Sequence, residues 1–157
     1  MSTKNFLTPA KKYKMVLSAV HMVYRLINST YNVKELSLRL TRLLCQFIQA
    51  SSSTIYILDP ETKKIVLIAI FNNQINILLE KKKEIARHAT EKERKVTNGY
   101  TIFEKHLVGL PLVADNNIGA IFIRRKKGEP AFTDSDQELL AVVAEQAVTA
   151  IKNLQLY

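Results

Sequence analysis

The spacing of apolar residues changes abruptly at Ser51. Before this residue, apolar side chains recur every three or four positions, which is the period of an amphipathic helix. After it, residues 53–58 and 65–71 form β-branched and aromatic runs that are typical of strands. The connection between the two runs is short and contains Asp59 and Pro60, which favour a turn. The sequence therefore predicts helices followed by an antiparallel hairpin, and not an alternation of strands and helices.

The first helix is predicted to begin at Thr8 and Pro9, because threonine caps a helix and proline fits its first position. One apolar stripe contains Tyr13, Val16, Leu17, Val20, Tyr24 and Ile27, and a second contains Met15, Ala19, Met22 and Leu26. A helix with so much apolar circumference is covered on two sides, so we expect one stripe in the core and the other against a partner helix. We assign the second stripe, together with Val148 and Leu156 of the last helix, to a dimer interface.

The second helix is predicted to begin at Asn32, with Glu35 in capping-box spacing. Its inner face is expected to contain Val33, Leu36, Leu40, Leu43, Leu44 and Phe47. Cys45 lies beside this stripe, and we interpret it as a packing residue, with a reactive thiol as the alternative. A lone cysteine forms no intrachain disulfide, so we expect a reducing, cytoplasmic compartment.

Residues 75–96 are predicted to form one covering helix over the sheet. Its narrow apolar stripe would consist of Ile75, Leu78, Ile85, Ala89 and Val96. Lys82 falls on this stripe, where it either extends to solvent or directs a cation at a ligand under the helix.

Asn98 and Gly99 form a strong turn signal, and a short strand at residues 100–103 follows it. Residues 106–114 and 118–125 are predicted to form a second hairpin. Pro111 lies in its first strand and has no N–H, so we expect a bulge or an open edge there. Thr133 and Asp136 have capping-box spacing and begin a last helix that runs almost to Tyr157.

These elements predict an α+β fold with a central antiparallel sheet of five to six strands. We expect the N- and C-terminal helices on one face, and the covering helix with its loops on the other, with a small cavity beneath them. Residues 1–11 would be a basic tail, and residues 12–157 a single domain. The longest apolar run, residues 65–71, is far shorter than the roughly 20 residues that span a bilayer, so we expect no membrane insertion.

The last third of the chain resembles the GAF domain family. The resemblance rests on Val-Gly-Leu-Pro-Leu at residues 108–112, Asn-Ile-Gly-Ala-Ile-Phe-Ile at 117–123, Phe-Thr-Asp-Ser-Asp-Gln-Glu-Leu-Leu at 132–140, and the alanine-rich helix that contains 144–147 and 150–154. Residues 52–64 are similar to the family's first hairpin, so the resemblance extends from about residue 12 to the end.

The resemblance implies a regulatory module that binds a small molecule under the covering helix, dimerises through its end helices and controls a signalling output domain. Such outputs include histidine kinases, diguanylate cyclases, phosphodiesterases and transcription activators. The cyclic-nucleotide signature of the family has only a loose counterpart in Phe132 and Asp136, so we assign no cyclic nucleotide. Bilin-binding members use a pocket cysteine, and the methionine-sulfoxide reductases need several, whereas Cys45 lies on the second helix. We therefore expect no covalent bilin, and the identity of any cofactor stays open.

Candidate ligand contacts lie around the predicted covering helix. They are Asn72, Asn73, Lys82, His88, Asn98, Tyr100, Thr101 and His106. The three histidines have no metal-ligand spacing and the four glycines are scattered, so we expect neither a metal, nor a nucleotide loop, nor catalysis in this chain.

The net charge of +9 suits an anionic partner. The charge is local, however, because residues 1–14 contribute +4, residues 80–95 contribute +3 and residues 124–127 contribute +4, which leaves −2 for the rest. No aromatic residues interleave with the patches at residues 80–95 and 124–127, so they disfavour nucleic acid, and the middle patch favours an anionic ligand in the cavity. A nucleic-acid module and a purely structural dimerisation domain remain as alternatives.

Overall fold

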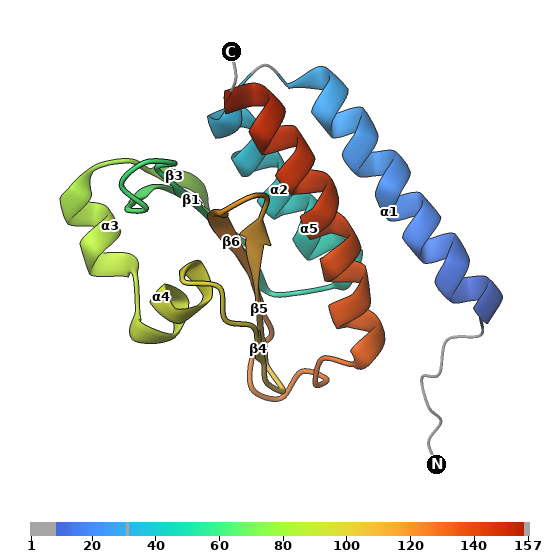
Figure 1. Ribbon diagram of the computed structural model, residues 1–157. Coiled ribbons are helices and arrows are strands. Elements are labelled where there is room, and N and C mark those ends of the chain that lie inside the picture. The colour runs from blue at the N-terminus through green and yellow to red at the C-terminus, as the bar shows by residue number, and fades with distance from the viewer. Residues whose placement is uncertain (1–8, 31, 156–157) are drawn as a thin grey trace.

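A six-stranded antiparallel sheet divides the molecule into two unequal layers of helices (Figure 1). The computed structural model describes residues 9–30 and 32–155. Their elements are α1 (Pro9–Ser29), α2 (Val33–Ile48), β1 (Ser52–Leu58), β2 (Ile65–Asn72), β3 (Asn76–Leu79), α3 (Lys82–His88), α4 (Glu91–Thr97), β4 (Ile102–Phe103), β5 (Leu107–Val113), β6 (Asn117–Arg124) and α5 (Asp134–Gln155). The strand order is β3-β2-β1-β6-β5-β4, and every neighbouring pair is antiparallel. The α+β fold class predicted from the sequence is confirmed.

Side-chain caps set the starts of two long helices where the sequence predicts them. Asn32 Oδ1 accepts the backbone N–H of Glu35 at 2.8 Å, which begins α2. Thr133 and Asp136 cap each other at the start of α5, with distances of 2.9 and 3.2 Å. Helix α1 begins at Pro9 as predicted, whereas Thr8 lies outside the described residues. These ends follow from local sequence, because a cap needs only residues that are three positions apart.

The three long helices lie on one face of the sheet (Figure 1). Helices α2 and α5 pack on the strands, and α1 packs on α5 and α2. The main core between them is aliphatic, with Leu40, Leu140 and Ile121 fully buried. Close-packed side chains fill the space between these helices and the sheet, and this packing contributes most to the stability of the fold.

The predicted covering helix over residues 75–96 is wrong. The chain forms strand β3 and then two short helices, α3 and α4. Asn72 Oδ1 accepts the backbone N–H groups of Gln74 at 2.8 Å and Ile75 at 3.0 Å, and this Asx turn reverses the chain so that β3 pairs with β2. Thr90 caps α4 by accepting the N–H of Glu93, which separates α4 from α3. Lys82 is thus the exposed first residue of α3, and not part of an apolar stripe.

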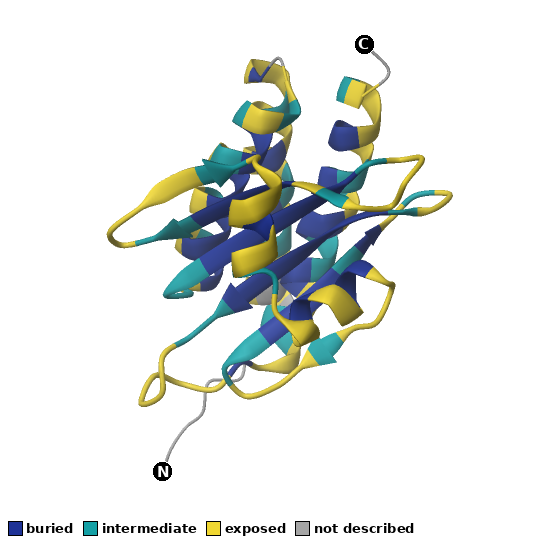
Figure 2. Cartoon of the chain, turned by 90° about the vertical axis from the view of Figure 1, so that its left-hand side faces the viewer, coloured by how far each residue is buried: buried dark blue, intermediate teal, exposed yellow. Residues whose placement is uncertain are grey.

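Helices α3 and α4 form a thin cap on the other face of the sheet. Figure 2 looks onto this cap: the outward surfaces of both helices are exposed, and the strands behind them are buried. A second, smaller core joins cap and sheet through Tyr56, Ile68, Ile70, Ile85, Val96, Ala120 and Phe122. Gly109 is needed here, because a Cβ at this position would lie 2.7 Å from the ring of Phe122. We name α3, α4 and their connection, residues 82–97, the cap.

Pro111 lies on β5 beyond the reach of β4, which pairs only with Val108 and Gly109. Its sole strand partner among the described residues is therefore Ala120 of β6. This open edge confirms the expectation from the missing N–H.

Candidate ligand-binding site

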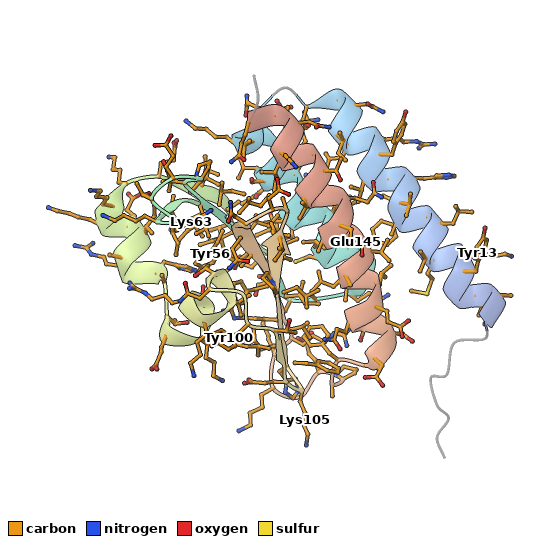
Figure 3. All side chains as sticks on the ribbon, viewed as in Figure 1. Tyr13, Tyr56, Lys63, Tyr100, Lys105 and Glu145 are labelled. Atoms are coloured by element: carbon orange, nitrogen blue, oxygen red, sulfur yellow. The ribbon has the colours of Figure 1, made fainter. Side chains whose placement is uncertain are left out.

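Four side chains from four elements form a polar cluster between the cap and the sheet. They are Tyr56 of β1, His88 of α3, Glu93 of α4 and Arg124 of β6. Arg124 Nη2 lies 3.2 Å from Glu93 Oε1, and the hydroxyl of Thr90 donates to the same oxygen at 2.9 Å. His88 Nε2 lies 3.9 Å from Glu93 Oε2, and the rings of Tyr56 and His88 are 6.3 Å apart. We call these four residues the cap cluster; Figure 3 shows Tyr56 between the sheet and the cap.

Two polar atoms of the cap cluster are buried and have no hydrogen-bond partner among the residues that the structure describes. They are the hydroxyl oxygen of Tyr56 and Glu93 Oε2. Tyr56 is fully buried, and the side chain of Glu93 is 3% exposed. A buried polar group without a partner costs about 1–3 kcal/mol, so these two atoms lower the free energy of unfolding of the domain.

Burial also changes the protonation of this cluster. Burial raises the pKa of Glu93 above its ordinary value, although Arg124 acts in the opposite direction. Burial, and then the positive charge of Arg124, lower the pKa of His88, so this imidazole is neutral at pH 7. The cluster therefore contains one fixed cation and one carboxyl group whose charge is costly.

Arg125, the next residue after Arg124, interacts with the opposite layer. Its guanidinium donates to the carbonyl oxygens of Ile48 at 2.6 Å and Gln49 at 3.2 Å, at the end of α2. It also donates to Asp136 Oδ2 at 3.3 Å and lies over the ring of Phe132, at the start of α5. Successive side chains of an extended chain point to opposite faces. Arg124 and Arg125 therefore connect the cap cluster with the ends of two long helices.

An open cavity of about 770 Å³ lies at the cap; its lining includes Ala89 and Arg94, the chain neighbours of His88 and Glu93, but none of the four cap-cluster residues. It lies between the β1–β2 turn, the start of β2 and the cap. Its lining residues are Thr62, Lys63, Lys64, Ile65, Val66, Glu80, Lys82, Ile85, Ala86, Ala89, Arg94, Thr97 and Asn98. This volume falls within the range of small-molecule sites.

The structure brings together only part of the ligand set predicted from the sequence. Lys82 and Asn98 line the cavity, and His88 belongs to the cap cluster. Asn72 forms the Asx turn before β3, and Asn73 is exposed beside it.

The other three members of that set lie elsewhere. Tyr100 is exposed, and Thr101 lines a separate hollow of about 360 Å³ next to α5. His106 Nε2 lies 3.1 Å from the carbonyl oxygen of Glu129, outside the cavity lining. These residues follow the cap along the chain, but none of them lines its cavity.

Sequence reasoning missed Tyr56, Glu93 and Arg124. The signal for Glu93 was present, because Thr90 and Glu93 have capping-box spacing and thus indicate a helix start. Tyr56 and Arg124 carried no such signal, since only the pairing of β1 with β6 places these distant residues on the same face of the sheet.

The predicted dimer residues do not form one surface. Ala19 is fully buried in the main core of its own chain, so it is not available to a second chain, and this corrects its assignment. Met15 and Leu26 also pack against that core, Met22 lines a groove between α1 and α2, and Val148 lines the hollow beside Pro111. Leu156 lies outside the described residues.

The other stripe of α1 faces outward only in part, because Val16 and Ile27 of that stripe pack against the main core. Tyr13 is 69% exposed, Tyr24 is 62% exposed and Leu17 is 42% exposed. Figure 3 shows Tyr13 projecting from the outer side of α1.

Neither Cys45 nor a cluster of potential metal ligands adds a reactive site among the described residues. Cys45 is buried, and burial raises the pKa of its thiol, which keeps it protonated and inert. Within residues 9–30 and 32–155, no three His, Cys, Asp or Glu side chains gather closely enough to hold a metal ion. Nor does any helix in these ranges have the length and apolar character to cross a membrane.

Comparisons with known proteins agree with this architecture. The GAF domain model matches residues 32–153. The fold is similar to the GAF domain of a phosphoenolpyruvate-protein phosphotransferase from Coxiella burnetii, with 13% identity, a TM-score of 0.66, and coverage of 91% of this chain and 96% of that one. It is also similar to residues 122 to 287 of a methyl-accepting chemotaxis protein, with 14% identity, a TM-score of 0.65, and coverage of 85% and 97%.

A third similar structure is the second GAF domain of DevS from Mycobacterium smegmatis, with 12% identity, a TM-score of 0.57, and coverage of 76% and 93%. The search of curated proteins finds no match. Because the family model covers most of the chain, from Asn32 at the start of α2 almost to the end of α5, the chain belongs to the GAF domain family.

Proposed function

We propose that this domain is a sensory and regulatory module that binds a small molecule between the cap and the sheet. Membership of the GAF family supports the regulatory role. The observation that carries the ligand site is the pair of buried, unpartnered polar atoms of Tyr56 and Glu93 beneath a cap that also walls an open cavity through Ala89 and Arg94, the chain neighbours of His88 and Glu93. A ligand that supplies their missing hydrogen bonds would stabilise one arrangement of the cap.

The signal would pass through Arg124 and Arg125. A ligand that changes the position of Glu93 also changes the position of its ion-pair partner, Arg124. Arg125 follows directly in the chain and donates to the end of α2 and the start of α5. A shift at the end of β6 would therefore change how these helices pack, and α1 packs on both.

The output would be read from the helical layer. The exposed stripe of α1, with Tyr13, Leu17 and Tyr24, suits a second copy of the chain. A signalling domain would follow these helices, and catalysis would belong to that domain and not to this chain. The buried, unreactive Cys45 is compatible with the cytoplasmic compartment that we propose.

Hydrogen–deuterium exchange on the Glu93→Gln variant tests this proposal without a ligand. We expect altered exchange rates in α4 and also at the end of α2 and the start of α5, because Arg124 loses its anionic partner. Glu104→Gln is the control, since Glu104 pairs at 3.0 Å with Lys92 on the exposed surface. A change confined to α4 would remove the transmission route and favour a purely structural dimerisation domain.

Sedimentation of the Leu17→Lys variant tests the dimer half of the proposal. We expect wild-type dimers at high micromolar concentration and monomers for the variant, with Lys127→Ala as an exposed control outside α1. A wild-type chain that sediments as a strict monomer would contradict this half.

A further inference from the structure

The cavity beside the cap cluster has a strongly unbalanced charge. Four cations line it, Lys63 and Lys64 from the β1–β2 turn and Lys82 and Arg94 from the cap. The structure pairs none of these four side chains with an acid among residues 9–30 and 32–155. The single acid in the lining, Glu80, is already paired with Lys34 at 2.5 Å.

Cations that surround a concave surface reinforce each other. Each one alone is a solvated surface charge, whereas several around one cavity raise the local concentration of anions. They come from two elements that are far apart in the sequence, so the fold, and not a run of lysines, gathers them.

The wall of the same cavity is apolar. Ile65 and Val66 of β2 contribute to it, together with Ile85, Ala86 and Ala89 of the cap. Val66 is 43% exposed, whereas the next four residues of β2 are buried. The cap therefore leaves an apolar part of the sheet uncovered at the place where the cations gather.

We propose that the ligand of this cavity is a small amphiphilic anion, with a carboxylate or phosphate group and a short apolar body. The anionic group contacts the cations of the turn and the cap, and the apolar body covers Val66 and Ile85. Binding connects the turn to the cap and closes the cavity across its open side. This inference rests on the proposed function, because it specifies the ligand class of the same site.

A titration followed by the backbone amide resonances tests the ligand class. The probes are hexyl phosphate and hexanoate, with hexanol and hexylamine as the matched neutral and cationic controls. We expect both anions to shift the resonances of residues 62–66 and 82–98, and to bind at least about tenfold more tightly than the two controls.

Variants locate the anionic group. The double variant Lys82→Gln/Arg94→Gln is expected to weaken hexyl phosphate binding by at least about tenfold and to leave hexanol binding unchanged. Lys126→Gln/Lys127→Gln removes two cations outside the cavity lining and should bind hexyl phosphate as the wild type does. Hexanol binding also shows that the first variant is folded, since the apolar wall is intact.

The outcomes separate this inference from the proposed function. If hexanol binds as tightly as hexyl phosphate, or if the double variant binds hexyl phosphate normally, the proposal that the ligand is an anion is overturned. The proposed ligand site under the cap is then retained. If vesicles of phosphatidylglycerol bind while the soluble anions do not, the ligand is a lipid surface and the inference also fails. If none of the four probes shifts residues 62–66, the inference is overturned, while the exchange experiment on Glu93→Gln still decides the proposed function.

Discussion

The two faces of the sheet bury side chains of different kinds. The helix face is covered by three long helices and filled with aliphatic residues, among them Leu40, Leu140 and Ile121. The cap face is covered by two short helices and buries the carboxyl group of Glu93 and the hydroxyl group of Tyr56. The polar groups buried in the helix layer are hydroxyls such as those of Ser37 and Thr41, which cost less to bury than a carboxylate. The difference indicates that the helix face provides the stability and the cap face provides the site.

The largest effect is expected on the helix face. Leu140→Ala should lower the free energy of unfolding by about 2–5 kcal/mol, because it leaves a cavity in a close-packed aliphatic core. Urea unfolding measures this loss. A loss below about 1 kcal/mol would show that this face is not the stable layer.

A somewhat smaller effect is expected at the connection between the faces. Arg125→Met should lower the free energy of unfolding by about 2–3 kcal/mol, because the carbonyl groups of Ile48 and Gln49 lose a charged donor. Lys126→Met, at the next and exposed residue, is the control. Equal unfolding free energies for the two variants would contradict the role of Arg125 in holding α2 and α5.

The cap face should respond in the opposite direction. Glu93→Gln should raise the free energy of unfolding by about 1 kcal/mol at pH 8, since burial makes the ionised carboxyl group costly in the folded state and its second oxygen has no partner. The pKa of Glu93 is higher in the folded state than in the unfolded chain. The wild type is therefore most stable below the ordinary pKa of a carboxyl group, and it loses stability as the pH rises through the raised pKa. The gain from the variant should therefore shrink as the pH falls toward 4. A variant that is less stable than the wild type at pH 8 would show that Glu93 is a structural residue.

The smallest effect concerns His88. Its pKa is lowered in the folded state by burial and by Arg124, so the unfolded chain takes up a proton first as the pH falls through 6.5. The free energy of unfolding should therefore decrease below that pH, and His88→Gln should remove this part of the slope. Tyr56, Glu93 and Arg124 face the imidazole, so the same titration in Glu93→Gln shows how far the carboxyl group contributes. An unchanged slope in His88→Gln would exclude the histidine as its source.

Local signals predicted most of the fold. The caps at Asn32 and Thr133, the two hairpins and the open edge at Pro111 each depend on residues that are close in the sequence. The error at residues 75–96 has a local cause, because Ile75, Leu78 and Ile85 have helical spacing although Asn72 reverses the chain before them. The Asx-turn tendency of Asn72 and the capping-box spacing of Thr90 and Glu93 are the local signals that argue against one continuous helix here.

The site and the orientation of α1 needed the tertiary structure. Both stripes of α1 are apolar, and the fold divides each of them: it buries Ala19, which allows close approach of α5, and leaves Met22, Tyr13 and Tyr24 exposed. Tyr56 and Arg124 both contact the ring of Phe122 because β1 pairs with β6: the ring centre of Tyr56 is 5.4 Å and the guanidinium carbon of Arg124 is 5.6 Å from its centre. No spacing along the chain encodes that contact, so sequence reasoning found the cap as a region but not the polar cluster beneath it.

A double-mutant cycle between Glu93→Gln and Arg125→Met tests the central claim, that the cap cluster and the helix layer are coupled through the end of β6. Glu93 and Arg125 share no hydrogen-bond partner within residues 9–30 and 32–155, and the effects of such separate sites add within about 0.3–0.5 kcal/mol. Transmission through Arg124 predicts a coupling free energy above about 0.5 kcal/mol in urea unfolding at pH 8. Additivity within the smaller range would contradict the account, because the two faces of the sheet would then be independent.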